Sequence, residues 1–204
     1  MLHWLKRKAE TRRIGHEIYE RIVAQARDPV FFRDMRVPDT MAGRLEMIVL
    51  HLALMLDRLK TEGAAGQRLG QHLMEHLVAD FDDALRQIGI GDMGVPRRVQ
   101  KAAAAFTERN QAYRAALGEA AGDRLETALA THVYGAGISG AGIGVDEALA
   151  AAAAGAARLA AYVRAAAWHL ANVPADRLFE GRGLFQAPEP ALAAAQTLVK
   201  DVRP

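Results

Sequence analysis

Apolar residues recur at spacings of three and four along most of this chain, and that pattern restricts it to helices. Between residues 41 and 59 the apolar series is Met41, Leu45, Ile48, Leu52, Met55 and Leu59. Steps of this size keep one face of an α-helix apolar. No stretch alternates β-branched with polar residues over four or more positions, so no strand is predicted. The sequence therefore predicts an all-α protein, folded as one compact multi-helix domain.

Capping residues, glycines and prolines predict where the helices begin and end. The helix of the apolar series should begin after Thr40 and stop at Gly63 and Gly66. Further helices are expected over about 67–88, from Pro96 to about 117, and over 123–133 and 146–172. The inner face of the last, alanine-rich helix is predicted to comprise Leu149, Ala153, Ala156, Leu159, Val163, Ala167 and Leu170. We expect a domain over 1–182 that includes a basic N-terminal arm at 1–14, and a C-terminal tail over 183–204.

Composition excludes several kinds of site. The 204 residues include no cysteine, which rules out disulfides, thiolate zinc sites, iron–sulfur clusters and a cysteine nucleophile. Twenty-six basic residues against 24 acidic ones are close to balance, so nucleic acid is not expected as the primary ligand. The P-loop string is absent, so an ATP-driven mechanism is not expected.

The N-terminal arm is basic and carries apolar residues. Through Arg36 there are nine basic and five acidic residues, an excess of four. We predict that this arm contacts an anionic membrane surface; a solvated first helix is the alternative. The membrane-contacting residues would be Trp4, Lys6, Arg7, Lys8, Arg12 and Arg13. No signal peptide or spanning segment is predicted, so we expect a cytoplasmic protein, peripheral at most.

Glycines gather between Gly135 and Gly144, where Gly135, Gly137 and Gly140 match the dinucleotide-binding string. That site needs a strand before the first glycine, and here a helix is predicted there. We interpret the segment as a hinge or a mobile loop.

Histidine and aspartate side chains share a stripe of the helix predicted at 67–88. His72, His76, Asp80 and Asp83 follow at steps of four, four and three, which keeps them on one face. Such a stripe could hold a metal or act as an acid–base pair. The Glu-x-x-His string of bundle metal sites is absent, so solvated boundary residues are the simpler interpretation. His51 lies within an apolar run, which is more typical of a hydrogen-bonded core histidine than of a ligand.

Three cations crowd the start of the helix that follows Pro96. Arg97, Arg98 and Lys101 lie where the helix dipole is positive, so folding alone does not favour them there. An anionic group of a partner would favour this arrangement; a solvated basic turn is the alternative.

An ordered series of residues resembles the ubiquinol–cytochrome c chaperone family. The series comprises Tyr19, Ile22–Arg27, Pro29, Phe31, Val37–Thr40, Gly43, Arg44, Leu50, His51, Arg58, Leu59, Asp80–Asp82, Leu85, Arg86, Gly89–Asp92, Val95, Arg97 and Lys101. A later group, Leu159, Tyr162, Leu178 and Gly181, is similar to the C-terminal end of that family. The resemblance covers roughly residues 19–181.

The resemblance implies an assembly factor and not an enzyme, with no cofactor. Relatives help newly made cytochrome b enter ubiquinol–cytochrome c reductase, together with a small accessory protein. The Ala- and Arg-rich composition suggests a bacterial chain, which would act at the cytoplasmic face of the inner membrane. The residues carried over as client or partner contacts are His51, Asp80, Asp82, Arg86, Gly89, Gly91, Asp92, Arg97 and Lys101. The alternative is a bundle that binds a metal or haem through His51, His72, His76 and Asp80.

Overall fold

The computed structural model describes residues 2–87, 95–119, 123–135 and 145–189, and the side chains of 10–83, 97–119, 123–135 and 150–189. These residues form helices and turns with no strand among them, which confirms the predicted all-α class. The elements are α1 (Leu2–Ala26), α2 (Pro29–Arg33), α3 (Met41–Leu59), a 3₁₀ turn (Lys60–Glu62), α4 (Gly63–Gln87), α5 (Val95–Leu117), α6 (Arg124–Leu129), a π turn (Ala130–Tyr134), α8 (Val145–Asn172) and α9 (Ala175–Phe179).

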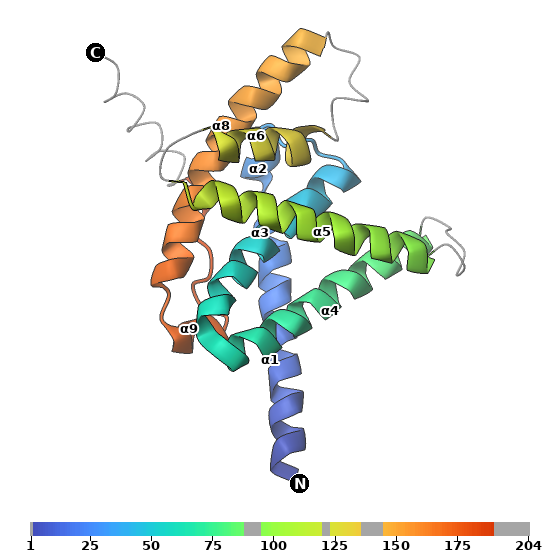
Figure 1. Cartoon of the computed structure of the whole chain (residues 1–204), viewed down its shortest axis with the longest axis vertical. Coiled ribbons are helices and arrows are strands. Elements are labelled where there is room, and N and C mark those ends of the chain that lie inside the picture. The colour runs from blue at the N-terminus through green and yellow to red at the C-terminus, as the bar shows by residue number, and fades with distance from the viewer. Residues whose placement is uncertain (1, 88–94, 120–122, 136–144, 190–204) are drawn as a thin grey trace.

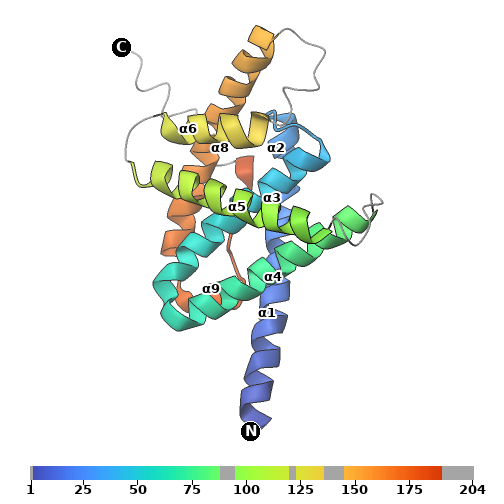
Figure 2. The ribbon, with the colours of Figure 1, turned by 45° about the vertical axis from the view of Figure 1, so that its right-hand side comes forward.

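Helix α3 is the inner helix of the bundle. It packs against α1, α4, α5 and α8, and twelve of its nineteen residues are buried. Figure 1 shows α5 crossing in front of it, α4 crossing in front of α1, and α4 and α5 converging at one end, while α6 lies across α8. The N-terminal part of α1 extends beyond the other helices, as Figure 2 also shows. Of the apolar stripe predicted for 41–59, Ile48, Leu52, Met55 and Leu59 are buried in the core, whereas Leu45 is half-buried and Met41 is exposed.

The start of α3 is fixed by a cap and by a close backbone approach. The Thr40 hydroxyl accepts a hydrogen bond from the Gly43 amide at 3.1 Å, which satisfies one of the free donors of the first turn. A Cβ at Gly43 would lie 2.0 Å from the Pro38 carbonyl oxygen. Thr40 is thus the predicted cap, and Gly43 is required because the preceding turn folds directly onto it.

The prediction that Gly63 and Gly66 both end a helix is wrong for Gly66. The chain turns at Gly63, whose φ of 56° suits glycine, and α4 starts there and not at residue 67. Gly66 is buried inside α4, where a Cβ would lie 2.0 Å from the Leu59 carbonyl oxygen. Its role is to let α4 pass close to the end of α3.

Small residues let α8 approach its neighbours closely. A Cβ at Gly155 would lie 2.6 Å from the Met35 carbonyl oxygen and 2.7 Å from the Tyr134 ring. The Tyr134 hydroxyl donates to that same carbonyl at 2.7 Å. The buried face of α8 includes Ala152 and Ala156, while Ala153, which was predicted to face inward, is exposed. The face is therefore rotated by one residue at this end of the helix.

The segment after α9 folds back onto the helices. Leu184 is buried, the Phe185 ring contacts the His51 ring, and Gln25 Nε2 donates to the Gln186 carbonyl at 3.0 Å. Arg58 of α3 donates to the Leu170 carbonyl in the last turn of α8 and to the Val173 carbonyl between α8 and α9, at 2.9 Å each. These contacts close the core opposite the α4–α5 face.

Candidate binding groove

A groove opens between α3, α4 and α5, with a volume of about 320 Å³. We call it the apolar groove. Its floor and walls are lined by apolar side chains, of which Val49, Leu77 and Phe106 are buried and Leu45, Met74 and Phe81 are half-buried. Val78, at the edge of the apolar groove, is 37% exposed. An apolar surface of this kind is typical of a binding site.

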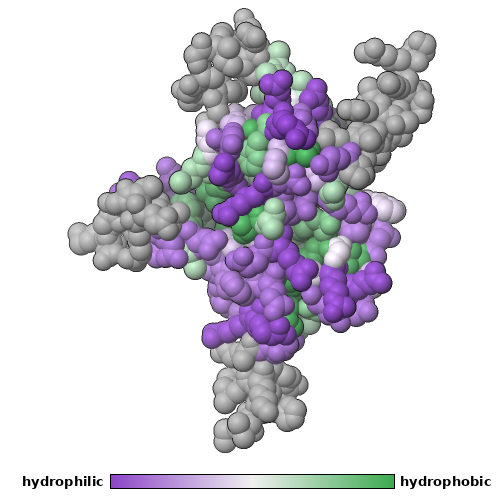
Figure 3. Space-filling view, turned by 180° about the vertical axis from the view of Figure 1, so that it is seen from behind, coloured by the Kyte–Doolittle hydropathy of each residue, from purple (hydrophilic) through white to green (hydrophobic). Residues whose placement is uncertain are grey.

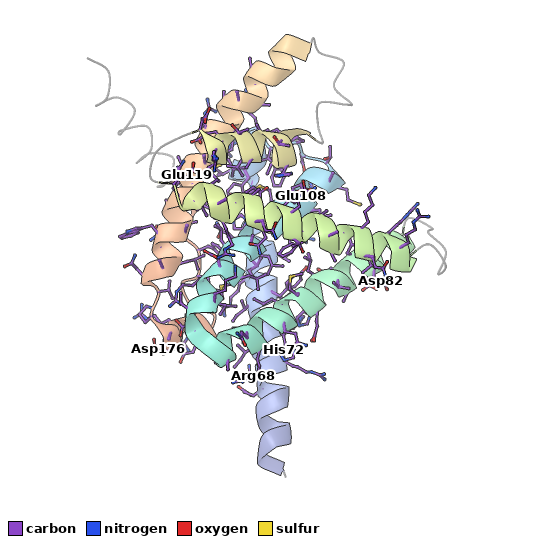
Figure 4. The ribbon with its side chains drawn as sticks, in the orientation of Figure 1. Arg68, His72, Asp82, Glu108, Glu119 and Asp176 are labelled. Atoms are coloured by element: carbon purple, nitrogen blue, oxygen red, sulfur yellow. The ribbon has the colours of Figure 1, made fainter. Side chains whose placement is uncertain are left out.

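The apolar groove exists because α5 presents alanines where a larger residue would fill the space. Ala102 and Ala105 line it from the α5 side, and their side chains end at Cβ. Helices α4 and α5 converge near Asp82 and diverge from there (Figure 4). The groove is thus a consequence of the small residues of α5 and the crossing of α4.

A buried ion pair holds the floor of the apolar groove. Arg109 of α5 donates two hydrogen bonds to the Glu46 carboxylate of α3, at 2.7 Å each, and Glu46 is 8% exposed. Burial raises the pKa of Glu46, and the charge and hydrogen bonds of Arg109 oppose that rise. The two parallel hydrogen bonds give the Glu46 carboxylate and the Arg109 guanidinium a partner of opposite charge. Glu46 therefore pairs with Arg109 and does not face the groove as a free acid.

Cations form one rim of the apolar groove. Arg98 and Lys101 of α5 line it, and both are exposed. Arg97, one residue earlier, is exposed as well. Two of the predicted contact residues, Arg97 and Lys101, therefore lie at the start of α5 beside an apolar surface, the arrangement expected if an anionic group of a partner docks there.

A second groove of about 760 Å³ adjoins the first between α1, the start of α3 and the end of α4. The two share Leu45, Leu77 and Phe81 as a common ridge. Met41, 69% exposed, lines the second groove. Figure 3 shows hydrophobic patches among hydrophilic residues on the rear face, one of them beside the grey residues that follow α4. The two grooves therefore lie side by side, and the shared residues Leu45, Leu77 and Phe81 form the boundary between them.

Acidic residues of α4 border the second groove. Asp80 and Asp83 line it, and Asp80 accepts a hydrogen bond from the Tyr19 hydroxyl of α1 at 2.9 Å. Burial and this carboxylate raise the pKa of Tyr19. Asp82 lies where α4 and α5 converge (Figure 4). The structure thus brings Asp80 and Asp82 to the same end of the molecule as Arg97 and Lys101.

The remaining predicted contact residues divide into two groups. Arg86 belongs to α4, but its side chain lies outside the described residues, as do Gly89, Gly91 and Asp92. His51 is described and is fully buried. It therefore has no exposed surface to offer a partner, in contrast to the other described residues of that set.

His51 is the hydrogen-bonded core histidine that the apolar run indicated. Its Nδ1 lies 2.8 Å from the Met47 carbonyl, and its Nε2 lies 2.8 Å from the Tyr162 hydroxyl of α8. Burial lowers the pKa of His51 to about 4. The imidazole is neutral at physiological pH and joins α3 to α8.

The residues of the metal or haem alternative do not converge. His51 faces α8, whereas His72 bonds to Glu75 on its own helix at 2.9 Å. His76 packs against His16 of α1, with ring centroids 5.2 Å apart, and burial lowers its pKa. Within the described part of the chain, no group of three or more histidine or carboxylate side chains is arranged to hold a metal ion.

From Leu2 onward the N-terminal arm is helical, as part of α1. Arg13 pairs with Glu10 and Glu17 on the same helix, and Arg12 is exposed. The side chains of Trp4, Lys6, Arg7 and Lys8 lie outside the described residues. None of the helices, as far as they are described, has the length and hydropathy to cross a membrane. The Gly135–Gly144 loop likewise falls outside the described residues after Gly135.

Sequence reasoning missed the apolar groove and the Glu46–Arg109 pair. The two charged residues are 63 positions apart, so no local spacing relates them. Glu46 offered one signal, since it is a carboxylate that falls between Leu45 and Met47 in an otherwise apolar helix. Such a residue must find a partner when the helix is buried.

An all-α bundle that leaves a charged-rimmed apolar groove open has the form of a helical binding protein. The sequence profile of the ubiquinol–cytochrome c chaperones matches residues 33–185, and the chain belongs to that family. It is similar to the crystal structure of the Cbp3 homolog from Brucella abortus, at 33% identity and a TM-score of 0.75, over 92% of this chain and 97% of the other. Curated proteins gave no match.

Proposed function

We propose that this chaperone binds newly made cytochrome b during assembly of ubiquinol–cytochrome c reductase, without catalysing a reaction. The apolar groove is the observation that carries the proposal. Its floor is apolar, and Val78 at its edge is exposed. A newly made membrane protein needs such a surface, since its apolar helices are costly to expose to water.

The groove would hold one apolar helical segment of the client by reversible burial. An amphipathic or apolar helix docks in a groove through side chains spaced three and four residues apart. Arg97 and Lys101 at one rim, with Asp80 in the second groove and Asp82 where α4 and α5 converge, would fix the position of the client through its flanking polar groups. We propose Arg86, Gly89, Gly91 and Asp92 as further contact residues, with a small accessory protein as a further partner.

The arm of α1 would bring the chaperone to the site where the client is inserted. It projects from the bundle (Figure 1), and its sequence is basic. A basic, partly apolar helix of this kind is attracted to anionic lipids. We propose a peripheral position at the cytoplasmic face of the inner membrane, with residues 1–182 acting as the chaperone domain and 183–204 as a tail whose first residues, Leu184 to Gln186, pack onto that domain.

Filling the groove tests the proposal. Ala102→Phe places a ring in the apolar groove, whereas Ala104→Phe places the same ring on an exposed position of α5 outside it. In a host lacking the gene, we expect Ala104→Phe to restore the b-haem absorbance of the membranes and Ala102→Phe to fail, at equal protein levels. Equal rescue by both variants would remove the groove from the mechanism, and unchanged b-haem in the deletion strain would remove the assembly role.

A further inference from the structure

A hollow of about 470 Å³ lies at the end of the second groove, between the C-terminal end of α1, α2 and the start of α3. We call it the arginine hollow. It is lined by Arg27, Pro29, Phe32, Arg33, Asp39 and Arg44. Arg27, Asp39 and Arg44 also line the second groove. The apolar groove, the second groove and the arginine hollow therefore form one track, with each depression sharing residues with the next.

The three arginines of the hollow differ in how far they are already neutralised. Arg33 forms two hydrogen bonds with its neighbour Asp34, at 2.9 and 2.7 Å. Arg44 donates through Nε to Asp39 at 2.7 Å, with both side chains more than half exposed. The guanidinium of Arg27 makes no ion pair or hydrogen bond with the described residues. Arg27 and Arg44 are thus the cations with donors left for another anion.

Phe32 holds one of these cations in place. The Arg44 guanidinium lies over the Phe32 ring, 6.0 Å from its centroid, a position that attracts a cation to the ring face. The side chain is therefore oriented before any ligand arrives, which lowers the cost of binding a carboxylate.

The charges along the track differ from one end to the other. Asp80 and Asp83 line the second groove from α4, while Arg27 and Arg44, with the Asp39 partner of Arg44, line it where it meets the arginine hollow. A carboxylate on an occupant would be repelled beside Asp80 and attracted at the arginine hollow. Because the depressions are continuous, one extended occupant can place an apolar segment in the grooves and an acidic group in the hollow.

We infer that Arg27 and Arg44 bind an acidic residue flanking the apolar segment of the client. This inference rests on the proposed function and adds a requirement on the client sequence. The apolar segment provides the burial, and the acidic flank decides in which direction the segment lies along the track.

Synthetic helical peptides test this with the full-length chain. Each peptide has a Leu/Ala core and a pair of Glu, Gln or Lys residues at one end. The pair is placed at the N-terminal end in one series and at the C-terminal end in another. Binding is measured by fluorescence anisotropy at low salt. We expect Arg27→Gln and Arg44→Gln each to weaken binding of the Glu-flanked peptide about threefold to fivefold, the upper part of the range for exposed charge pairs. The Gln-flanked peptide should bind both variants as it binds the wild type.

Two further variants sharpen the test. Arg68→Gln removes an exposed arginine of α4 that lines none of the three depressions, and it should change no peptide affinity. Arg27→Glu should reverse the preference, so that the Lys-flanked peptide binds more tightly than the Glu-flanked one. This reversal cannot result from loss of folding.

The outcomes separate this inference from the proposed function. The inference is overturned if all three peptides bind equally and if substitution of Arg27 or Arg44 changes none of the three affinities. The apolar groove would then still stand as a client site. Absence of binding even for the Gln-flanked peptide overturns both. Arginine-dependent binding to phosphatidylglycerol vesicles, without discrimination among the peptides, would show that a lipid headgroup occupies the hollow and would also overturn the inference.

Discussion

Glu46 of α3 and Arg109 of α5 are joined by two parallel hydrogen bonds of 2.7 Å beneath the apolar groove. Arg109 also donates to the Ala105 carbonyl of its own helix at 3.1 Å. The pair fixes the spacing of two helices that carry small or aliphatic side chains at this level. The width of the apolar groove thus depends on an electrostatic contact at its base.

Removing either partner of this pair should destabilise the protein by about 2–4 kcal/mol, because the other charge would remain poorly solvated. We expect Glu46→Gln and Arg109→Gln each to lower the free energy of unfolding in urea. The double variant should lose less unfolding free energy than the sum of the losses of the two single variants. Additive costs would mean that the pair contributes no coupling energy.

Acid should destabilise the fold through His51. Its pKa is about 4 in the folded chain against 6.5 for a free imidazole, so the unfolded chain binds the extra proton between these values. The free energy of unfolding is then highest above pH 6.5, falls as the pH drops from 6.5 to 4, and levels off below pH 4. The loss amounts to roughly 3 kcal/mol, measurable by urea unfolding across this range.

His51→Gln is the matched variant, since an amide can still bond to the Met47 carbonyl and the Tyr162 hydroxyl but does not titrate. We expect its stability to depend less steeply on pH between 6.5 and 4 than that of the wild type. If both chains lose stability in parallel, other groups cause the acid effect, for example His76, whose pKa burial also lowers.

Gly155→Ala should separate α8 from its neighbours. The new Cβ would lie 2.6 Å from the Met35 carbonyl oxygen, so the backbone must shift at a cost of about 1–3 kcal/mol. Gly118→Ala is the control, because its Cβ would meet its nearest neighbour at an ordinary 3.5 Å. Thermal unfolding should show a lower Tm for Gly155→Ala alone, and equal Tm values would contradict the close approach.

Arg58 should stabilise the C-terminal end of α8. It is nearly buried and donates to the Leu170 and Val173 carbonyls and to Glu62. Arg58→Ala should cost about 2–3 kcal/mol, since charged donors to buried acceptors are strong. Arg58→Lys should recover only part of this in denaturant unfolding, because an ammonium lacks the planar fork. Full recovery by lysine would show that charge alone suffices.

The helices were predictable because their signals are local. The apolar stripe of α3 and the Thr40 cap follow from residues three or four positions apart, and His51 was correctly expected in the core. Gly66 was misassigned because a glycine that ends a helix and one that permits a close approach look the same in sequence. The difference depends on Leu59, which meets Gly66 only after the chain has turned.

The candidate site was predictable only in its charged rim. Asp80, Arg97 and Lys101 were selected from the family resemblance, and the structure brings them to one end of the bundle. The apolar groove itself could not be read from the sequence, since the half-buried Phe81 belongs to the same stripe as the buried Leu73 and Leu77. Which part of a stripe stays uncovered is decided by the angle at which α5 crosses.

The alanine face of α8 has a consequence for the entropy of folding. Leucine or isoleucine loses rotamer freedom when a helix packs, whereas alanine has no side-chain rotamers to lose. Ala152, Ala156 and Ala160 are almost fully buried in α8, so ordering the 28-residue helix restricts only the backbone at these three positions. The small area that each alanine buries is thereby matched by a small entropic penalty, in contrast to the buried Leu159 and Tyr162 of the same helix.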